Sequence, residues 1–154
     1  MEMLKYVETA VTFSEIPDEI TLAINISGCP CNCKGCHSSY LAEDIGTELT
    51  FNEVRKLIKK NNGISCIALM GGDAEPNKIN ALASFIINHY SSIKVAWYSG
   101  RQELSEDIEL SNFDFIKLGP YKGEFGPLNS RTTNQRFYKV SDGELIDITS
   151  KFWK

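Results

Sequence analysis

A dense group of cysteines limits what this chain can fold into more than any other feature. Four of the five cysteines fall within eight residues, at positions Cys29, Cys31, Cys33 and Cys36. They directly follow residues 20–26, an apolar run rich in β-branched side chains that predicts a buried strand. Gly, Pro and Asn residues between the cysteines oppose both strand and regular helix. The segment must therefore form a loop, and such a loop can direct several sulfurs at one centre.

The spacing of the cysteines favours a metal centre. Cys29, Cys33 and Cys36 form a Cys-x3-Cys-x2-Cys pattern, and cysteine thiolates are the ligands that hold iron–sulfur clusters. An odd number of cysteines without a signal peptide disfavours a secreted disulfide framework. Zinc is the main alternative, although the second cysteine pair of most structural zinc sites is missing. We expect Cys31 to be an additional thiol near the centre and Cys66 to be a small core residue.

Length and charge limit the class of protein. The 154 residues suit one domain, 1–154, that is long enough to bury a core. The net charge is −4, and no basic run alternates with aromatic residues, so we expect no nucleic-acid partner. No apolar stretch approaches the length of a membrane span, and the first residues lack the pattern of a secretory leader. These features predict a soluble, cytoplasmic protein that does not bind membranes.

Strand and helix patterns alternate along the chain. Apolar segments predict four strands, at 20–26, 64–70, 93–98 and 113–118. Helices are expected at 38–43, at 50–60 behind a Thr50–Glu53 capping box, at 76–90, and around Leu104 and Ile108. The rest is predicted as a loose edge strand at 3–12, a long loop at 121–134 and a hairpin at 136–149. This alternation predicts an α/β fold with a mainly parallel sheet and flanking helices.

Several loops should meet at one edge of that sheet. Loops that follow parallel strands open on the carboxyl edge, where ligands gather in α/β folds. The cysteine loop, Gly71-Gly72-Asp73, Ser99-Gly100 and Lys117-Leu118-Gly119 all follow predicted strands. Two successive glycines let the backbone approach a ligand closely, and Asp73 adds a carboxylate that can accept hydrogen bonds from an ammonium group.

These motifs resemble those of the radical S-adenosylmethionine enzymes. The sequence Ser-Gly-Cys-x3-Cys-x-Gly-Cys-His at 27–37 is similar to their cluster loop. The resemblance implies that Cys29, Cys33 and Cys36 bind a [4Fe-4S] cluster, whose remaining iron chelates S-adenosyl-L-methionine. It also implies that Gly71, Gly72 and Asp73 grip the methionyl amino group, and that Gly35 and His37 lie against the nucleoside.

Two further stretches resemble the activating proteins of anaerobic ribonucleotide reductase. They are Trp97-Tyr98-Ser99-Gly100, which adds Ser99 to the expected cofactor-binding residues, and 129–136, in which Arg131-Thr132-Thr133-Asn134-Gln135 resembles the Arg-x-Ser/Thr-x-Asn-Gln element of these proteins. This resemblance implies an activase that cleaves S-adenosylmethionine reductively and generates a glycyl radical on the large reductase subunit. It implies an electron donor such as flavodoxin. It also implies a partial TIM-like barrel with a curved sheet, whose open side admits the partner's glycine loop.

Two stretches depart from the family pattern. Residues 13–19 replace a Gly-Pro-Gly-x-Arg stretch, and Lys117 stands near the end of the fourth strand, where members often carry Asp. Lys117 could instead face the carboxylate of the ligand. Two alternatives remain at this point: a radical S-adenosylmethionine enzyme that activates or modifies another substrate, and a non-catalytic zinc-binding module that recruits partners.

Overall fold

One eight-stranded sheet forms the centre of the structure. The computed structural model describes residues 4–13, 16, 19–26, 47–73, 75–120, 124–126, 128 and 130–152. The strands are β1 (Lys5–Thr12), β2 (Thr21–Ile26), β3 (Thr47–Glu48), β4 (Cys66–Met70), β5 (Lys94–Tyr98), β6 (Phe115–Leu118), β7 (Arg136–Ser141) and β8 (Glu144–Asp147). They lie side by side in the order β3-β1-β2-β4-β5-β6-β7-β8.

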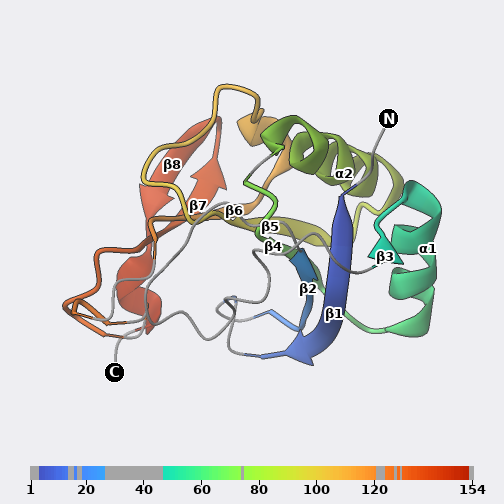
Figure 1. Cartoon of the computed structure of the whole chain (residues 1–154), viewed down its shortest axis with the longest axis horizontal. Helices are drawn as coiled ribbons and strands as arrows, with labels where there is room; N and C mark the ends of the chain where they lie inside the picture. Colours follow the sequence, from blue (N-terminus) through green and yellow to red (C-terminus); the bar gives the residue numbers. More distant parts are fainter. Residues whose placement is uncertain are drawn as a thin grey trace.

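The two described α-helices pack on one face of this sheet. The described helices are α1 (Phe51–Lys60), α2 (Pro76–His89) and the short 3-10 helices η2 (Leu110–Asn112) and η3 (Thr149–Phe152). Figure 1 shows α1 next to β3 and β1 at one end of the sheet, α2 over the middle strands, where it contacts β5, and the β7–β8 hairpin at the opposite end. None of the helices in the described ranges has the length and apolar character needed to cross a membrane.

The predicted fold class is wrong. We expected a helix-flanked, mainly parallel sheet in a partial TIM-like barrel, but four of the seven strand pairings are antiparallel. Only the neighbours β2, β4, β5 and β6 run parallel to one another. The strands that pair antiparallel lie on both sides of this parallel centre. The described residues therefore form a mixed sheet with two α-helices.

The helix expected around Leu104 and Ile108 is also absent from the described chain. Residues 101–109 form turns and bends that lead into η2. Like charges oppose a helix there, because Glu103 and Asp107 would lie one turn apart. The side chain of Asn80 in α2 offers a competing partner, since its Oδ1 accepts the Glu109 backbone N–H at 2.8 Å.

Other predicted elements are confirmed. The four predicted strands of the parallel centre correspond to β2, β4, β5 and β6. Helix α1 begins after Thr50, whose hydroxyl accepts the Glu53 N–H at 3.1 Å. The second half of the capping box does not form, because the Glu53 carboxylate accepts the Tyr6 hydroxyl at 2.9 Å. Burial and this hydrogen bond raise the pKa of Tyr6. The helix expected at 38–43 lies outside the described residues.

The expected hairpin is formed by β7 and β8. Ser141 pairs with Glu144 across a turn of two residues, Asp142 and Gly143. Their φ angles are 51° and 77°, the left-handed backbone that a tight hairpin of this kind needs. The Asp-Gly pair therefore gave a correct hairpin prediction.

The two faces of the parallel centre carry side chains of different size. Large residues pack beneath the helices, among them Leu22, Ile24, Ile67, Leu69, Val95, Trp97 and Ile116. The other face carries Cys66, Ala68 and Ala96, packed with Ile16, Phe115 and Phe137. Because strand side chains alternate between faces, this division follows from a period of two in the sequence.

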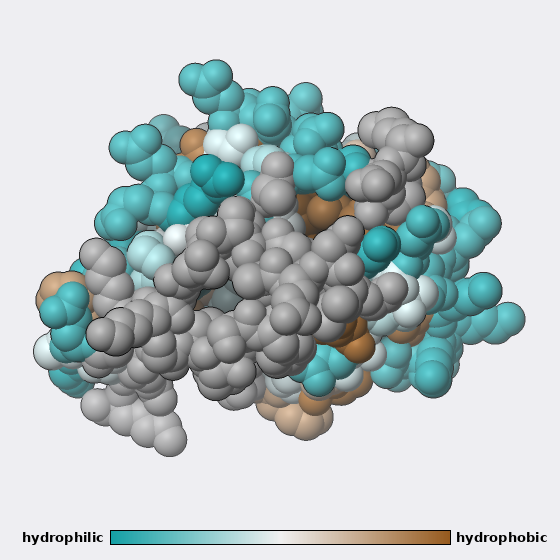
Figure 2. All heavy atoms as spheres, viewed as in Figure 1, coloured by the Kyte–Doolittle hydropathy of each residue, from teal (hydrophilic) through white to brown (hydrophobic). Residues whose placement is uncertain are grey.

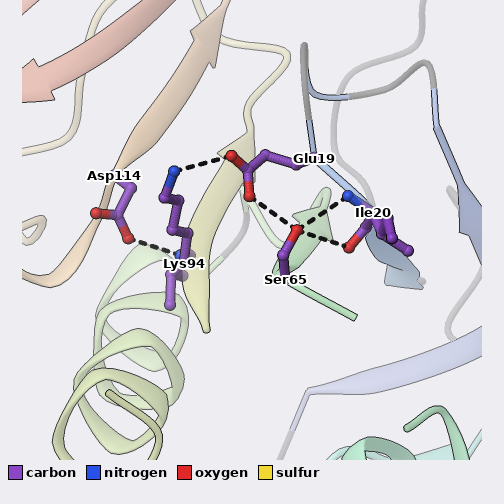
Figure 3. Close-up of polar contacts among 6 residues, drawn as sticks. Glu19, Ile20, Ser65, Lys94 and Asp114 are labelled. Carbon is purple, nitrogen blue, oxygen red and sulfur yellow. Dashed lines mark hydrogen bonds and ion pairs between the residues drawn. The ribbon is translucent and has the colours of Figure 1, made fainter. Parts of the chain in front are cut away.

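Charged and hydroxyl side chains hold the amino ends of the parallel strands together (Figure 3). The Glu19 carboxylate accepts the Ser65 hydroxyl at 2.8 Å and the Lys94 ammonium at 2.8 Å. The Asp114 carboxylate accepts the backbone N–H of Val95 at 2.9 Å. These contacts join the segments that open β2, β4, β5 and β6, so this end of the sheet serves stability.

Cys66 makes folding stability sensitive to alkaline pH. Burial, and then the charge of Glu19, raise its pKa from 9.0 to about 12. Between these values the unfolded chain has lost the thiol proton and the folded chain has kept it, so the free energy of unfolding falls as pH rises. The loss is at most about 4 kcal/mol.

We expect urea unfolding of the wild type to show a steeper decline between about pH 9 and pH 12 than that of Cys66→Ala. The variant keeps a shallower decline, because the pKa values of Tyr6 and Lys94 are also raised. Equal slopes for the two proteins would contradict the prediction.

Candidate functional site

The loops that follow β4, β5 and β6 meet at one edge of the sheet. The Gly71 N–H donates to the Tyr98 carbonyl at 3.0 Å, and the Trp97 indole N–H donates to the Gly71 carbonyl at 2.7 Å. The Ser99 N–H donates to the Lys117 carbonyl at 2.9 Å. The structure thus brings together the predicted site residues Gly71, Gly72, Asp73 and Ser99.

Asp73 ties two of these loops together. Its side chain is fully buried, and its carboxyl oxygens accept the Ser99 hydroxyl at 2.5 Å and the Gly100 N–H at 2.9 Å. The Arg101 guanidinium donates to the Asp73 backbone carbonyl at 2.9 Å. In the structure this carboxyl therefore serves as a link between the β4 and β5 loops. Its expected contact with a ligand ammonium stays a prediction.

Lys117 extends the network to the β6 loop. Its side chain is 7% exposed, and its ammonium donates to the Ser99 carbonyl at 3.2 Å and the Gly119 carbonyl at 2.6 Å. The Gln135 amide reaches the same Gly119 carbonyl at 3.5 Å. The segment 129–136 thus contributes at least one buried side chain to this edge. Two of the Lys117 contacts are to backbone carbonyls, whereas we considered a ligand carboxylate from the sequence.

The glycine pair packs against the end of β2. Gly71 and Gly72 have φ angles of +105° and +80°. A Cβ at Gly71 would lie 3.1 Å from the carbonyl oxygen of Ile26, and one at Gly72 would lie 2.5 Å from Cδ1 of Ile79. Ile26 is the last residue of β2 before the cysteine segment begins. The glycines therefore keep side-chain atoms away from the carboxyl end of β2.

Two effects disfavour a side chain at Gly72: its left-handed backbone and its close approach to Ile79. A comparison of Gly72→Ala with Gly63→Ala should separate them. Gly63 has a similar φ of +97°, but a Cβ there would meet nothing within 4 Å. We expect Gly63→Ala to cost about 1–2 kcal/mol of unfolding free energy, the usual cost of a left-handed backbone. Gly72→Ala should cost about 1–3 kcal/mol more, because the new methyl group overpacks the Ile79 side chain. Equal losses in denaturant unfolding would show that Ile79 moves aside without cost.

A row of residues lies next to these loops, and two of them, Asn25 and Met70, had no role predicted from the sequence. Asn25, Met70, Tyr98 and Lys117 align across β2, β4, β5 and β6 at the carboxyl ends of the strands. The first three are partly exposed. Each of the four lies close to the start of a loop of the candidate site. By the alternation of side chains along a strand, all four lie on the face of the sheet opposite to Leu69 and Trp97. The period of two at the end of each strand is the sequence signal that could have identified them.

The predicted cluster ligands Cys29, Cys33 and Cys36, together with Gly35 and His37, lie outside the described residues. Their roles therefore stay predictions. Within the described ranges, no group of three or more His, Cys, Asp or Glu side chains is arranged to hold a metal ion. The thiolate donor set fits an iron–sulfur cluster.

The chain matches a family model, although no curated protein and no solved structure matches it. The family described as "4Fe-4S single cluster domain" matches residues 20–122, which is more than half of the 154 residues. The matched range begins at β2 and includes the cysteine segment and the loops after β4, β5 and β6. The match supports an iron–sulfur cluster as the cofactor, and the chain therefore belongs to the family of 4Fe-4S single cluster domains.

Proposed function

We propose that this protein is a radical S-adenosylmethionine activase that generates a glycyl radical on a partner enzyme, the large subunit of anaerobic ribonucleotide reductase. The observation that carries the proposal is the Cys29, Cys33 and Cys36 triple inside a 4Fe-4S single cluster domain. Three thiolates leave one iron of such a cluster without a protein ligand, and an outside molecule can bind there. The Gly71-Gly72-Asp73 turn, which packs against the strand that leads to the cysteines, supplies the second line of support.

The proposed cofactors are the cluster and S-adenosyl-L-methionine. Cys29, Cys33 and Cys36 would hold the cluster. The chemistry that it supplies when bound is the one-electron reductive cleavage of S-adenosylmethionine, whose adenosyl fragment takes a hydrogen atom from a glycine of the partner. A small electron-transfer protein such as flavodoxin would supply the electron.

The role of the remaining site residues is to shape the binding surface. Gly71 and Gly72 have no side chains, so backbone groups can approach the methionyl part of the ligand. Asp73 and Ser99 hold the β4 and β5 loops at a fixed separation through their hydrogen bond of 2.5 Å. We assign Gly35 and His37 to the nucleoside side of the ligand, as the sequence resemblance implies.

The open form of the sheet supports a protein substrate. Its two outermost described strands, β3 and β8, lie at opposite ends of the strand order and do not pair with each other. A sheet that does not close on itself has free outer strands, and we propose that the glycine loop of a larger protein approaches the site from such an open side.

Anaerobic reconstitution with iron and sulfide tests the proposal in three stages. A brown protein with the visible absorption of a cluster is expected first. After reduction it should cleave S-adenosylmethionine to methionine and 5′-deoxyadenosine. With the large subunit of anaerobic ribonucleotide reductase, electron paramagnetic resonance should detect a glycine-centred radical.

Each stage can fail in a distinct way. A colourless protein with stoichiometric zinc would contradict the cluster and favour a non-catalytic module. A cluster-loaded protein that leaves S-adenosylmethionine intact would contradict the radical chemistry. Cleavage without a glycyl radical on the reductase subunit would contradict the proposed partner.

A further inference from the structure

A cavity of about 570 Å³ lies between α1 and α2, and its lining includes none of the loop residues of the candidate site. Its walls are mainly apolar, with Leu4, Phe51, Leu82 and Phe85 among them, and Arg55 and Lys78 also line it. The two aromatic rings stack with centroids 4.5 Å apart, and the Arg55 guanidinium lies 5.2 Å from the centroid of Phe85. The cavity is large enough for an apolar side chain of a partner.

Helix α1 presents an unusual concentration of positive charge beside this cavity. Arg55, Lys56, Lys59 and Lys60 are all exposed in a chain whose net charge is −4. Figure 2 shows hydrophilic residues gathered over the α1 side of the molecule. Within the described part of the chain, none of these four side chains forms an ion pair. The one acidic residue of the helix, Glu53, accepts the Tyr6 hydroxyl instead.

Helix stability alone does not account for all of these charges. Cations in the last turn, here Lys59 and Lys60, interact favourably with the negative end of the helix dipole. Arg55 lies one turn earlier, and it repels Lys59 at a spacing of four residues. Phe51, Arg55 and Lys59 lie four residues apart along one side of the helix, so the apolar cavity wall continues into a row of cations.

We infer that the cavity and the adjoining cations of α1 form a docking surface for a segment of a partner protein that carries an apolar side chain flanked by carboxylates. The apolar side chain would enter the cavity between Phe51 and Leu82, and the carboxylates would pair with Arg55 and Lys59. Charge complementarity selects an acidic partner. The apolar cavity favours a polypeptide over a nucleic acid, which has no aliphatic side chain to fill it. This docking does not depend on the proposed cluster chemistry.

Three fluorescein-labelled helical peptides test this inference on the full-length protein. The first carries a Leu and Phe stripe flanked by Glu, the second replaces each Glu by Lys, and the third keeps Glu but replaces the stripe by Ser. Fluorescence anisotropy should show binding of the first peptide that weakens as salt is added. The second and third peptides should bind at least about tenfold more weakly.

Variants of the protein identify the surface. The double substitution Arg55→Glu with Lys59→Glu should weaken binding of the first peptide at least about tenfold and improve binding of the Lys peptide. Ala81→Phe should also weaken binding, because position 81 is exposed on α2 and lines the cavity. Lys139→Glu, at an exposed position of β7 near the other end of the sheet, is the matched control and should leave binding unchanged.

Several results would overturn the inference. One is absence of binding of the first peptide up to about 1 mM. Others are equal binding of the Glu and Lys peptides, or binding that survives both the charge reversal and Ala81→Phe. Tighter binding of a DNA duplex than of the acidic peptide, lost in the charge-reversed variant, would assign the cations of α1 to nucleic acid instead.

Discussion

Substitution of Cys29, Cys33 or Cys36 by Ala should abolish the cluster. Each variant removes one of only three proposed thiolate ligands, so the anaerobically reconstituted protein should lose its visible absorption and bind iron and sulfide far below wild-type levels. Cleavage of S-adenosylmethionine should be lost with it. Iron and sulfide analysis together with the absorption spectrum measures the effect.

The two other cysteines provide matched controls. Cys31→Ala should keep the cluster, because Cys31 lies outside the Cys-x3-Cys-x2-Cys pattern. Cys66→Ala should also keep it, since the Cys66 side chain is fully buried in β4 and its pKa of about 12 keeps the thiol protonated. Loss of the cluster in Cys31→Ala would mean that four thiolates bind the metal. No iron would then remain for S-adenosylmethionine, and the proposed chemistry would be wrong.

Substitution of Asp73 by Ala should cause a large loss of stability. The change removes the acceptor of the Ser99 hydroxyl and of the Gly100 N–H. A donor left without its partner costs about 1–3 kcal/mol, and two donors lose their acceptor here, so we expect the free energy of unfolding to fall by about 2–6 kcal/mol. Urea unfolding, with unchanged m-value, measures this loss.

Two further variants serve as controls for Asp73→Ala. Asp107→Ala lies in the exposed connection before η2 and should change stability by no more than about 0.5 kcal/mol. Asp73→Asn keeps the shape and one carbonyl acceptor, so its loss should fall between the other two. If Asp73→Ala were as stable as the wild type, the link between the β4 and β5 loops would contribute nothing to folding, and a direct role toward ligand would become the simpler explanation.

Local patterns predicted much of the fold correctly. The apolar runs at 20–26, 64–70, 93–98 and 113–118 correspond to four neighbouring parallel strands, because a strand covered on both faces needs a nearly continuous apolar sequence. Thr50 begins a helix as predicted, since its hydroxyl satisfies a backbone donor only a few residues away. These elements depend on interactions between near neighbours in the sequence.

The overall fold class could not be obtained in this way. The alternation of apolar side chains in Lys5–Thr12 and in Arg136–Ser141 fits a parallel or an antiparallel neighbour equally well. The connecting segments decide the direction in which each of these strands runs along its neighbour, and hence the antiparallel pairing. The helix expected around Leu104 failed for a related reason, because Asn80 in α2 binds the backbone of that segment.

The sequence by itself determined the cysteine spacing, the glycine turn, the parallel strands and hence a loop-lined edge of the sheet, because each depends on the chemistry of adjacent residues. Only the tertiary structure decided that the Asp73 carboxyl binds Ser99, 26 residues further along the chain, and that Lys117 reaches the Gly119 carbonyl. It alone placed the cations of α1 beside an apolar cavity. Such contacts depend on which loops and helices come together in space, and local sequence patterns do not predict this arrangement.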